Sequence, residues 1–462
     1  MRIRVTPGAG TSDGGARRVP GDKSIAHRWL ILASTADGRS RLVGLPASLD
    51  VRSTASCLSR VTRRARPALE LWARNAASRV EDGGSTWNGR SRDSREEGST
   101  DVLELEGEGR DSLVEPSTDL DCGNSGTSMR LLAGVLSAAP FRSRLIGDAS
   151  LHARPMERVA VPLRRMGAEV RTTDGHAPLE ISGAPLRGIE YRLDVPTAQV
   201  KTAILLAGLA AEGETVVVEP TQTRDHTERI LTALGAPIGR RDGTVAVSRF
   251  QHAGLEGAVP GDVSSASFLI GAAGITGAEV TIRDVGLNPT RIGFVGVLAR
   301  MGIRCDAEAT GEQLGEPVGT IRARRVGPLT GTTIEADEMP GVIDEVPMLA
   351  AVAAVAAGQT RFLGAGELRV KESDRLARVA EGIRSLGGNA LAAGDELIVA
   401  GGGLVGGSAS SSGDHRLAMA FAVAAAGANA PSEIDGIEAA DVSFPGFVAA
   451  LRSVGVDVEA SG

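Results

Sequence analysis

Aromatic residues are scarce in this chain. Phe, Trp and Tyr together make up 3% of its 462 residues, and Tyr191 is the only tyrosine. The core must therefore be built mainly from Ala, Val, Leu and Ile. Proteins that bind single-stranded nucleic acid stack the bases on aromatic side chains, so a surface of that kind is not expected here.

Cysteine is also rare, and the spacings typical of metal ligands are lacking. Cys57, Cys122 and Cys305 are odd in number and lie far apart, without the paired spacing of a zinc site or a disulfide framework. The six histidines show neither HxH nor HxxxH spacing. The sequence therefore predicts no metal site, and its few cysteines indicate a reducing cytoplasm.

Long apolar runs are missing as well. The longest, such as Val346 to Ala357, fall short of the roughly 18 residues that a membrane span requires. The opening MRIRVTPGAG has no apolar stretch like that of a signal peptide. With 42% hydrophobic and 23% charged residues, the composition is that of a soluble globular protein, and we expect one that is not exported.

Lysine is the rarest of the charged residues. Lys23, Lys201 and Lys371 are the only three among 50 basic residues, so the other 47 are arginines. A lysine that persists in such a chain marks a site that needs a compact ammonium with an adjustable pKa, unless it survives by chance. The net charge of −7 gives no general attraction to polyanions, so an anionic ligand must be held by a local group of cations.

A recurring pattern organises the whole chain. A polar motif opens an apolar helix, which is followed by a small-residue turn and a short β-branched strand. A second helix closes most units with Leu or Met before Gly, as in RRMGAEV and LARMGIRC, which is an expected C-terminal cap. Six units of roughly 70 residues predict an α/β fold of two lobes with three units each, divided near Val259. The openings are PGDKSIAHR at Pro20, CGNSGTSMR at Cys122, VPTAQVKTA at Val195, PGDVSSASF at Pro260, VIDEVPMLA at Val342 and SGDHRLAMA at Ser412.

The first unit is interrupted between about residues 63 and 100. From Arg79 onward this stretch is polar, rich in glycine and mixed in charge, so we expect a solvated and mobile insertion. Its arginines could instead mark a partner site. Trp72 is expected on a short helix near the start of the insertion.

The six helix openings predict an anion site. A helix N-terminus presents unpaired N–H groups and a partial positive charge. Several openings add a cation, including Lys23, Arg130, Lys201 and Arg416. Units stacked in parallel would aim these helix ends into a cleft between the lobes, which suits substrates with phosphates and carboxylates. The nucleotide P-loop GxxxxGK[ST] is absent, because no lysine follows a glycine.

Two segments carry candidates for acid–base chemistry. Lys371 and Glu372 stand before an amphipathic helix that residue 373 or 374 can cap. They offer an anion contact and a proton carrier with an adjustable pKa, or else form an ordinary charged turn. Asp344 and Glu345 begin an otherwise apolar helix, where capping alone needs only one carboxylate.

A third segment, GDHRLAMAFAVAAAG, is apolar after its opening residues. This places His415 and Arg416 at the helix start and away from its buried body. A lone histidine is usually structural, but the adjacent arginine equally favours an anion contact.

Nine motifs, in order from Pro20 to Met419, together resemble the EPSP synthase family of enolpyruvyl transferases. The match covers nearly the whole chain apart from the insertion, and RVKESDRL with PGDKSIAHR is highly specific. The resemblance implies two lobes, each of three βαβαββ units, with residues 21–257 in the N-terminal lobe and residues 1–20 and 258–462 in the C-terminal lobe. The motifs are PGDKSIAHR, LDCGNSGTSMR, the RPM of HARPMERV, TAQVKTA, RDHTERIL, GDVSSASF, VIDEVP, RVKESDRL and GDHRLAM.

The resemblance also implies an activity in the shikimate pathway, which supplies chorismate and the aromatic amino acids. Members transfer the enolpyruvyl group of phosphoenolpyruvate to the 5-hydroxyl of shikimate 3-phosphate by addition and elimination, release phosphate, and are the target of glyphosate. The resemblance implies a cytoplasmic monomer without a cofactor. Its expected partners are these two small molecules, with neither nucleic acid nor a membrane.

Matching motif positions imply roles for individual residues. Asp344 would act as base for the hydroxyl, Glu372 as partner for the proton at C3, and Lys23 as proton relay. The residues expected to bind shikimate 3-phosphate are Lys23, Ser24, Arg28, Thr197, Ala198 through its backbone N–H, Gln199, Thr223, Asp344 and Lys371. The residues expected to bind phosphoenolpyruvate are Lys23, Asn124, Gly126, Arg154, Gln199, Arg375, His415 and Arg416.

Some positions depart from the family pattern. Glu367 and Val442 stand where some members carry Asn and Lys, so those contacts are not carried over. The resemblance implies no role for Lys201. Gly126 matches glyphosate-sensitive members, which predicts sensitivity.

Two other functions compete with this one. UDP-N-acetylglucosamine enolpyruvyl transferase shares the architecture, but it would show an early Lys-Asn pair and a reactive Cys in a Gly-rich loop, and neither is present. A non-catalytic repeat scaffold would explain the six units, but not Lys371 and Glu372 at a helix start.

Overall fold

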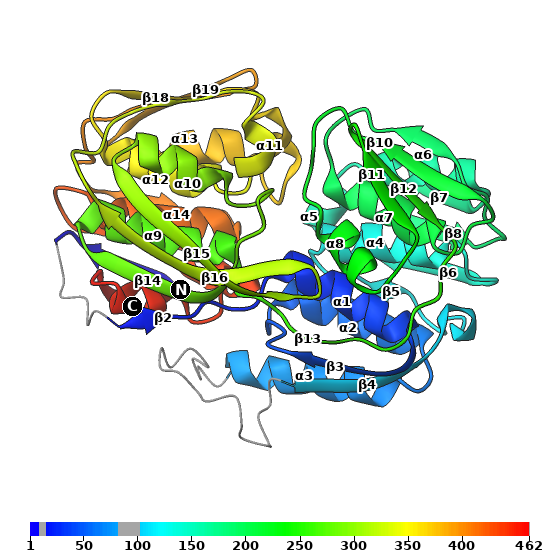
Figure 1. The fold of residues 1–462 in the computed structure, drawn as a ribbon. Helices are drawn as coiled ribbons and strands as arrows, with labels where there is room; N and C mark the ends of the chain where they lie inside the picture. The colour runs from blue at the N-terminus through cyan, green and yellow to red at the C-terminus, as the bar shows by residue number, and fades with distance from the viewer. Residues whose placement is uncertain (9–14, 82–101, 462) are drawn as a thin grey trace.

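The computed structural model describes residues 1–8, 15–81 and 102–461. Their strands form six sheets, and the chain folds into two lobes that lie side by side (Figure 1). Helices and strands alternate throughout, so the predicted α/β class is confirmed. Among the described residues, no helix combines the length and the apolarity needed to cross a membrane.

The N-terminal lobe holds three of the sheets, in the orders β13-β3-β4, β5-β6-β8-β7 and β9-β10-β12-β11. Its strands are β3 (Asp37–Val43), β4 (Val102–Glu108), β5 (Leu120–Asp121), β6 (Arg142–Ile146), β7 (Glu169–Thr173), β8 (His176–Ser182), β9 (Glu190–Arg192), β10 (Glu214–Val218), β11 (Ile238–Arg241), β12 (Thr244–Ser248) and β13 (Glu256–Ala258). Its helices are α1 (Lys23–Thr35), α2 (Leu49–Val61), α3 (Arg66–Glu81), α4 (Gly126–Leu136), α5 (Ala149–His152), α6 (Glu157–Met166), α7 (Ala198–Gly208) and α8 (His226–Ala233), with a 3-10 turn η1 (Arg110–Ser112).

The C-terminal lobe holds the other three, in the orders β2-β14-β16-β15, β17-β18-β20-β19 and β21-β22-β1-β23. Its strands are β1 (Arg2–Thr6), β2 (Ala16–Arg17), β14 (Glu279–Gly286), β15 (Ile303–Gln313), β16 (Glu316–Arg325), β17 (Thr333–Ile334), β18 (Gln359–Phe362), β19 (Asn389–Ala393), β20 (Glu396–Ala400), β21 (Ser408–Ser410), β22 (Ser432–Asp435) and β23 (Asp457–Ser461). Its helices are α9 (Val263–Thr276), α10 (Gly293–Arg300), α11 (Met339–Val342), α12 (Val346–Val355), α13 (Arg375–Ser385), α14 (His415–Ala425) and α15 (Phe447–Ser453), with 3-10 turns η2 (Gly366–Val370) and η3 (Ile437–Val442).

The sheets share one pairing pattern. In each sheet the first two strands are parallel, as in β5 with β6 and β17 with β18, and the remaining pairs are antiparallel. In the last sheet β1, from the other end of the sequence, pairs antiparallel with both β22 and β23. The common order supports the prediction of repeated units, and the strands β1 and β2 lie with the C-terminal lobe.

The longest apolar helices occupy the middle of each lobe. In the C-terminal lobe α9, α12 and α14 contact one another, and nearly all of their residues are buried. A helix that is apolar on every face must be enclosed in this way. In the N-terminal lobe α1, α4 and α7 hold the equivalent place. The polar residues that open these helices therefore lie at the N-terminal ends of buried helices.

The predicted insertion is only partly a loop. Its first part forms α3, which packs on α2 and β4. Leu69, Trp72 and Ala76 are buried on one face of α3, so Trp72 does lie on a helix, as expected. The helix is longer than expected, and it spans Arg66–Glu81 within the stretch predicted as an insertion. The remainder, residues 82–101, lies outside the described residues.

The chain passes between the lobes through two copies of the tetrapeptide VPGD, at residues 19–22 and 259–262. Gly21 and Gly261 form an antiparallel bridge, and the two segments exchange backbone hydrogen bonds. A Cβ at Gly21 would lie 2.2 Å from the carbonyl oxygen of Gly44, so only glycine permits this crossing. Asp22 and Asp262 then cap α1 and α9.

Candidate active site

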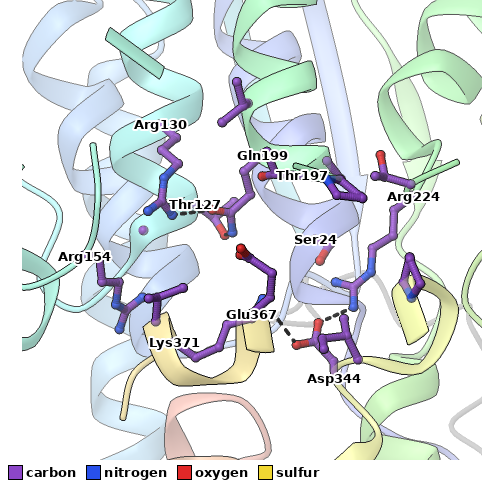
Figure 2. Close-up of a pocket in the computed structure, with 18 of the residues that line it drawn as sticks. Ser24, Thr127, Arg130, Arg154, Thr197, Gln199, Arg224, Asp344, Glu367 and Lys371 are labelled. Carbon is purple, nitrogen blue, oxygen red and sulfur yellow. Dashed lines mark hydrogen bonds and ion pairs between the residues drawn. The ribbon is translucent and has the colours of Figure 1, made fainter. Parts of the chain in front are cut away.

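A cavity of about 320 Å3 lies between the lobes. The N-terminal lobe contributes the starts of α1, α4 and α7, together with parts of the loops before α6 and α8. The C-terminal lobe contributes residues around α11, the segment from η2 to the start of α13, and the start of α14. Figure 2 shows side chains from both lobes pointing into this space. Five of the six predicted helix openings therefore contribute residues to one cavity, and the opening at Pro260 does not.

Lys23 is the first residue of α1. The helix begins here because the Asp22 carboxylate accepts a hydrogen bond from the Ile25 N–H, at 3.0 Å. The Lys23 ammonium lies 2.7 Å from Oδ2 of Asp50, a cavity residue that the sequence analysis did not identify. The next residue, Ser24, also lines the cavity.

Gly126 begins α4 beside a bonded set of polar side chains. Arg130 donates to Gln199 Oε1 at 2.5 Å, and Gln199 donates to Thr127 Oγ1 at 2.9 Å (Figure 2). Burial and the nearby charge of Arg154 lower the pKa of Arg130 to about 10, so it stays cationic at neutral pH. A Cβ at Gly126 would lie 2.8 Å from Nη1 of Arg130, which leaves no free space for a methyl group.

Arg154 stands at the boundary between the lobes. Its guanidinium donates to Asn124 Oδ1 at 2.7 Å and lies 3.7 Å from Glu372 Oε1 in the other lobe. Asn124 itself does not line the cavity. Asn124 therefore holds Arg154 in place, and its direct contact with phosphoenolpyruvate stays a prediction.

Arg28, expected to bind shikimate 3-phosphate, does not line the cavity either. Its guanidinium is buried one turn behind Ser24, where it donates to the Ser24 carbonyl at 2.7 Å. It also donates to the hydroxyls of Thr202 and Thr227, both at 2.8 Å. These bonds join α1 to α7 and α8. In this structure Arg28 packs three helices together, and a ligand contact for it stays a prediction.

Thr197, Ala198 and Thr223 line the cavity close to the start of α7. The Thr197 side chain makes no capping hydrogen bond to α7, so the helix N–H groups there have no side-chain cap. The Thr223 hydroxyl donates to Glu219 Oε1 at 2.5 Å. Glu219 in turn accepts from the buried ammonium of Lys201, at 3.0 Å. Lys201 thus supports the loop that carries Thr223 and does not itself reach the cavity.

Asp344 is the most heavily surrounded carboxylate of the site. Arg224 reaches across from the N-terminal lobe to donate to its Oδ2 (Figure 2). Arg375 and Arg416 lie 3.7 Å from its oxygens, and Lys371 lies 4.0 Å away. Burial alone would raise the pKa of Asp344, but these cations hold it well below its usual range. Asp344 is therefore an ionised acceptor.

Glu372 lies beside the same cations. Arg375 contacts its Oε2 at 2.5 Å and is itself fixed by Asp414, 2.8 Å from its Nε. Burial would raise the pKa of Glu372, but the charges of Arg375 and Arg154 hold it well below its usual range.

His415 follows Asp414, which caps α14. Burial, reinforced by the charge of Lys23, holds the pKa of His415 well below its usual range, so its imidazole is neutral. Among the described residues, its Nε2 has no hydrogen-bond partner. His415 lines the cavity, and this nitrogen is buried beside it.

The charge of the lining decides which ligands fit. Eight side chains are cationic and four are carboxylates, in a chain whose net charge is −7. The cations are Lys23, Arg130, Arg154, Arg158, Arg224, Lys371, Arg375 and Arg416, and the carboxylates are Asp50, Asp344, Glu367 and Glu372. A concave site with this excess attracts small polyanions.

A family model described as EPSP synthase (3-phosphoshikimate 1-carboxyvinyltransferase) matches residues 13–68 and 91–451 of the chain. The chain belongs to the EPSP synthase family. It is 46% identical to the 3-phosphoshikimate 1-carboxyvinyltransferase of Halorhodospira halophila, over 99% of this chain and 97% of the relative. It is 44% identical to that of Acidithiobacillus ferrooxidans, over 99% of both chains. The solved EPSP synthase from Acinetobacter baumannii superposes with a TM-score of 0.79 at 36% identity, over 100% of both chains.

Within this family member, the structure gathers all predicted site residues except Arg28 and Asn124 around the cavity. It adds cavity residues that are not among the predicted substrate-binding residues. Arg130 and Arg224 stood within motifs already recognised, so a cation near a helix start was a usable signal. Arg158, in HARPMERV at the start of α6, offered the same signal, and Asp50 did not. The added residues are Asp50, Thr127, Arg130, Arg158, Arg224 and Glu367.

Proposed function

We propose that the chain transfers the enolpyruvyl group of phosphoenolpyruvate to the 5-hydroxyl of shikimate 3-phosphate, and so acts as a 3-phosphoshikimate 1-carboxyvinyltransferase. The products are 5-enolpyruvylshikimate 3-phosphate and phosphate. The observation that carries the proposal is the convergence of Lys23, Asp344, Lys371 and Glu372 from two lobes on one cationic cavity. Membership of the EPSP synthase family supports the same reaction.

The cavity divides naturally between the two substrates. Shikimate 3-phosphate binds along the N-terminal lobe, where Ser24 and Thr223 offer hydroxyls and the uncapped start of α7 offers N–H groups at Thr197 and Ala198. Asp344 and Lys371 face it from the other lobe and contact its ring hydroxyls. Gln199 lies between the two substrates and contacts both.

Phosphoenolpyruvate binds where the cations are densest. Arg154, Arg375 and Arg416 hold its carboxylate and phosphate by paired N–H contacts. Gly126 lets the substrate approach the start of α4, and the free Nε2 of His415 offers a further hydrogen bond. Lys23 contacts both substrates, because it lies on the lobe that binds the shikimate ring and its charge reaches Glu372.

The first step is an addition. Asp344, held ionised by its cations, accepts the proton of the 5-hydroxyl while the oxygen bonds to C2 of phosphoenolpyruvate. C3 gains a proton from Glu372 in the same step. In the second step the C2–O bond to phosphate breaks, C3 returns its proton to Glu372, and phosphate leaves with the proton relayed by Lys23. The arginines stabilise the charge that develops on the leaving phosphate.

Glu372 needs a proton for this role, yet its pKa is low in the ligand-free site. The cause is its contact with Arg375 at 2.5 Å and the charge of Arg154. When the anionic groups of phosphoenolpyruvate occupy these arginines, their charge is offset and the pKa of Glu372 rises. Substrate binding thus prepares Glu372 to donate.

Single-turnover phosphate release with both substrates tests the proposal. Asp344→Asn and Glu372→Gln should each slow the chemical step by about 10²- to 10⁴-fold, as expected for loss of a general acid or base. Glu381→Gln is the matched control, because Glu381 lies on α13 but is half exposed and paired only with Arg378 at 2.7 Å. Near-normal rates in both active-site variants would refute the assignment.

Calorimetry separates this reaction from its rivals. Shikimate 3-phosphate should bind, and glyphosate should tighten that binding. A scaffold protein would bind neither molecule, and an enzyme acting on a UDP-sugar would not bind shikimate 3-phosphate. We further propose a cytoplasmic monomer that needs no cofactor, for which light scattering should give a mass near 47.4 kDa.

A further inference from the structure

Arg291 lies at the crossing of the two VPGD segments, in the loop between β14 and α10. Its side chain is only 3% exposed. Nη1 donates to Oδ2 of Asp22, at 3.1 Å, and Nη2 lies 3.6 Å from Oδ1 of Asp262. One guanidinium therefore contacts the capping carboxylates of α1 and α9, which belong to different lobes.

The same guanidinium also reaches the segment that carries Asp344. Nη2 donates to the Ser264 hydroxyl at 2.6 Å, and that hydroxyl donates to Oε1 of Glu345. Nη2 itself lies 3.8 Å from Glu345 Oε1. Glu345 is buried at the start of α12 and directly follows Asp344. Arg291 is thus two hydrogen bonds away from the carboxylate next to the proposed base.

Arg291 is the cation with the largest effect on the pKa of both capping carboxylates. Burial would raise the pKa of Asp22, but the charge of Arg291 brings it down to about 2. Burial and the charge of Asp22 raise the pKa of Asp262 to about 6, even with Arg291 present. Two buried carboxylates therefore repel each other at the lobe crossing, and Arg291 is what keeps them together.

We propose that Arg291 is a positioning residue that sets the register of Lys23 in one lobe against Asp344 in the other. It fixes the start of α1 through Asp22, and with it Lys23, which follows directly. It fixes Asp344 through Ser264 and Glu345. The inference rests on the proposed function and deepens it, because it names the side chain that aligns Lys23 of one lobe with Asp344 of the other. A misplacement of about 1 Å can cost roughly 10²-fold in rate even when it arises far from the chemistry.

Steady-state kinetics of Arg291→Met test the proposal. We expect kcat to fall at least tenfold, while KM for shikimate 3-phosphate changes less than threefold, because the N-terminal lobe supplies most of its contacts. Arg300→Met is the matched control. Arg300 lies on α10 and forms a surface ion pair with Glu338 at 3.0 Å, so that variant should stay within twofold of the unmodified enzyme.

A second substitution distinguishes positioning from general stability. Asp262→Asn keeps a side chain that can cap α9 but removes one of the two repelling charges. The double variant Arg291→Met/Asp262→Asn should recover at least threefold in kcat over Arg291→Met. If kcat per folded molecule in Arg291→Met equals that of the unmodified enzyme and only the melting temperature falls, the proposal is wrong. Failure of the double variant to recover any activity also contradicts it.

If Arg291→Met is insoluble, Arg291→Lys decides, because an ammonium cannot make the forked contacts to Asp22 and Ser264 at once. A loss of at least threefold in kcat then supports the proposal, and an unchanged kcat refutes it.

If the unmodified protein releases no phosphate from the two substrates, the proposed function fails, and with it the role of Arg291 in that reaction. An active unmodified enzyme with a fully active Arg291 variant refutes the positioning role alone.

Discussion

Removing the ammonium of Lys201 should destabilise the N-terminal lobe strongly. Lys201 is completely buried on α7, with its ammonium 2.6 Å from Glu228 and 3.0 Å from Glu219. Lys201→Met keeps the length and the apolar stem of the side chain but leaves two buried carboxylates without their nearest cation, with only Arg240 at 3.9 Å from Glu228 among the described residues. Oε2 of Glu228 already has no hydrogen-bond partner among the described residues. The sequence predicts Lys201 among the cations of the anion site, but in the structure it is buried and does not line the cavity.

The size of the effect follows from the burial. Deleting one partner of a buried ion pair typically costs about 3–5 kcal/mol, because the charge left behind cannot be solvated. Adding Glu228→Gln to the Lys201→Met variant removes one of the uncompensated charges. The double variant Lys201→Met/Glu228→Gln should therefore recover at least about 1 kcal/mol of the loss.

Tryptophan fluorescence during urea unfolding measures these changes in the free energy of unfolding. All three tryptophans fall within residues 21–257, and Trp29 and Trp72 are buried there, so the signal follows the lobe that contains Lys201. A Lys201→Met variant whose free energy of unfolding lies within about 1 kcal/mol of the unmodified protein would refute the reasoning. So would a double variant less stable than the single one.

Three other predictions concern the site and the pH dependence of stability. Lys23→Arg keeps the charge but not the compact contact with Asp50, so kcat should fall by roughly 10²-fold; full activity would show that the scarcity of lysine is no guide to function. Gly126→Ala should raise both KM for phosphoenolpyruvate and the inhibition constant of glyphosate, because the methyl displaces Arg130; in the unmodified enzyme, an inhibition constant hundreds of times the phosphoenolpyruvate constant would contradict the expected sensitivity. Burial holds the pKa of His27 well below 6.5, so below that pH only the unfolded chain takes up the proton and stability falls by about 1.4 kcal/mol per pH unit. Urea titrations of His27→Gln between pH 6.5 and 5 should show a free energy of unfolding that falls less steeply with pH, by about 1.4 kcal/mol per pH unit. If the pH dependence of the variant equals that of the unmodified protein, His27 is not its cause.

Several helices of the fold could be predicted from the sequence because they begin with a local signal. The motifs that open at Pro20 and Pro260 do cap α1 and α9, through Asp22 and Asp262. The apolar runs that follow identified the buried helices. The length of α3 was underestimated because the polar, glycine-rich residues after Arg79 dominated the composition of that stretch.

The site was harder to predict where its contacts join distant parts of the chain. Asp344 was identified from its local motif, but its pairing with Arg224 spans 120 positions and both lobes. Arg28 shows the same limit from the other side. Its motif placed it correctly on α1, but which face it presents, and to what, depends on α7 and α8. Local patterns specify helix starts, and only the packed lobes specify which side chains turn toward the cavity.

The pairing of β1 with β22 and β23 has a consequence for synthesis on the ribosome. Residues 21–257 are contiguous, so the N-terminal lobe can fold as soon as it has emerged. β1 leaves the ribosome first, yet both of its neighbours are made after residue 430. At about 5–20 residues per second, the strand waits roughly 20 to 90 s with both edges unpaired. During that interval it is exposed to chaperones, and to the same strand of another nascent chain.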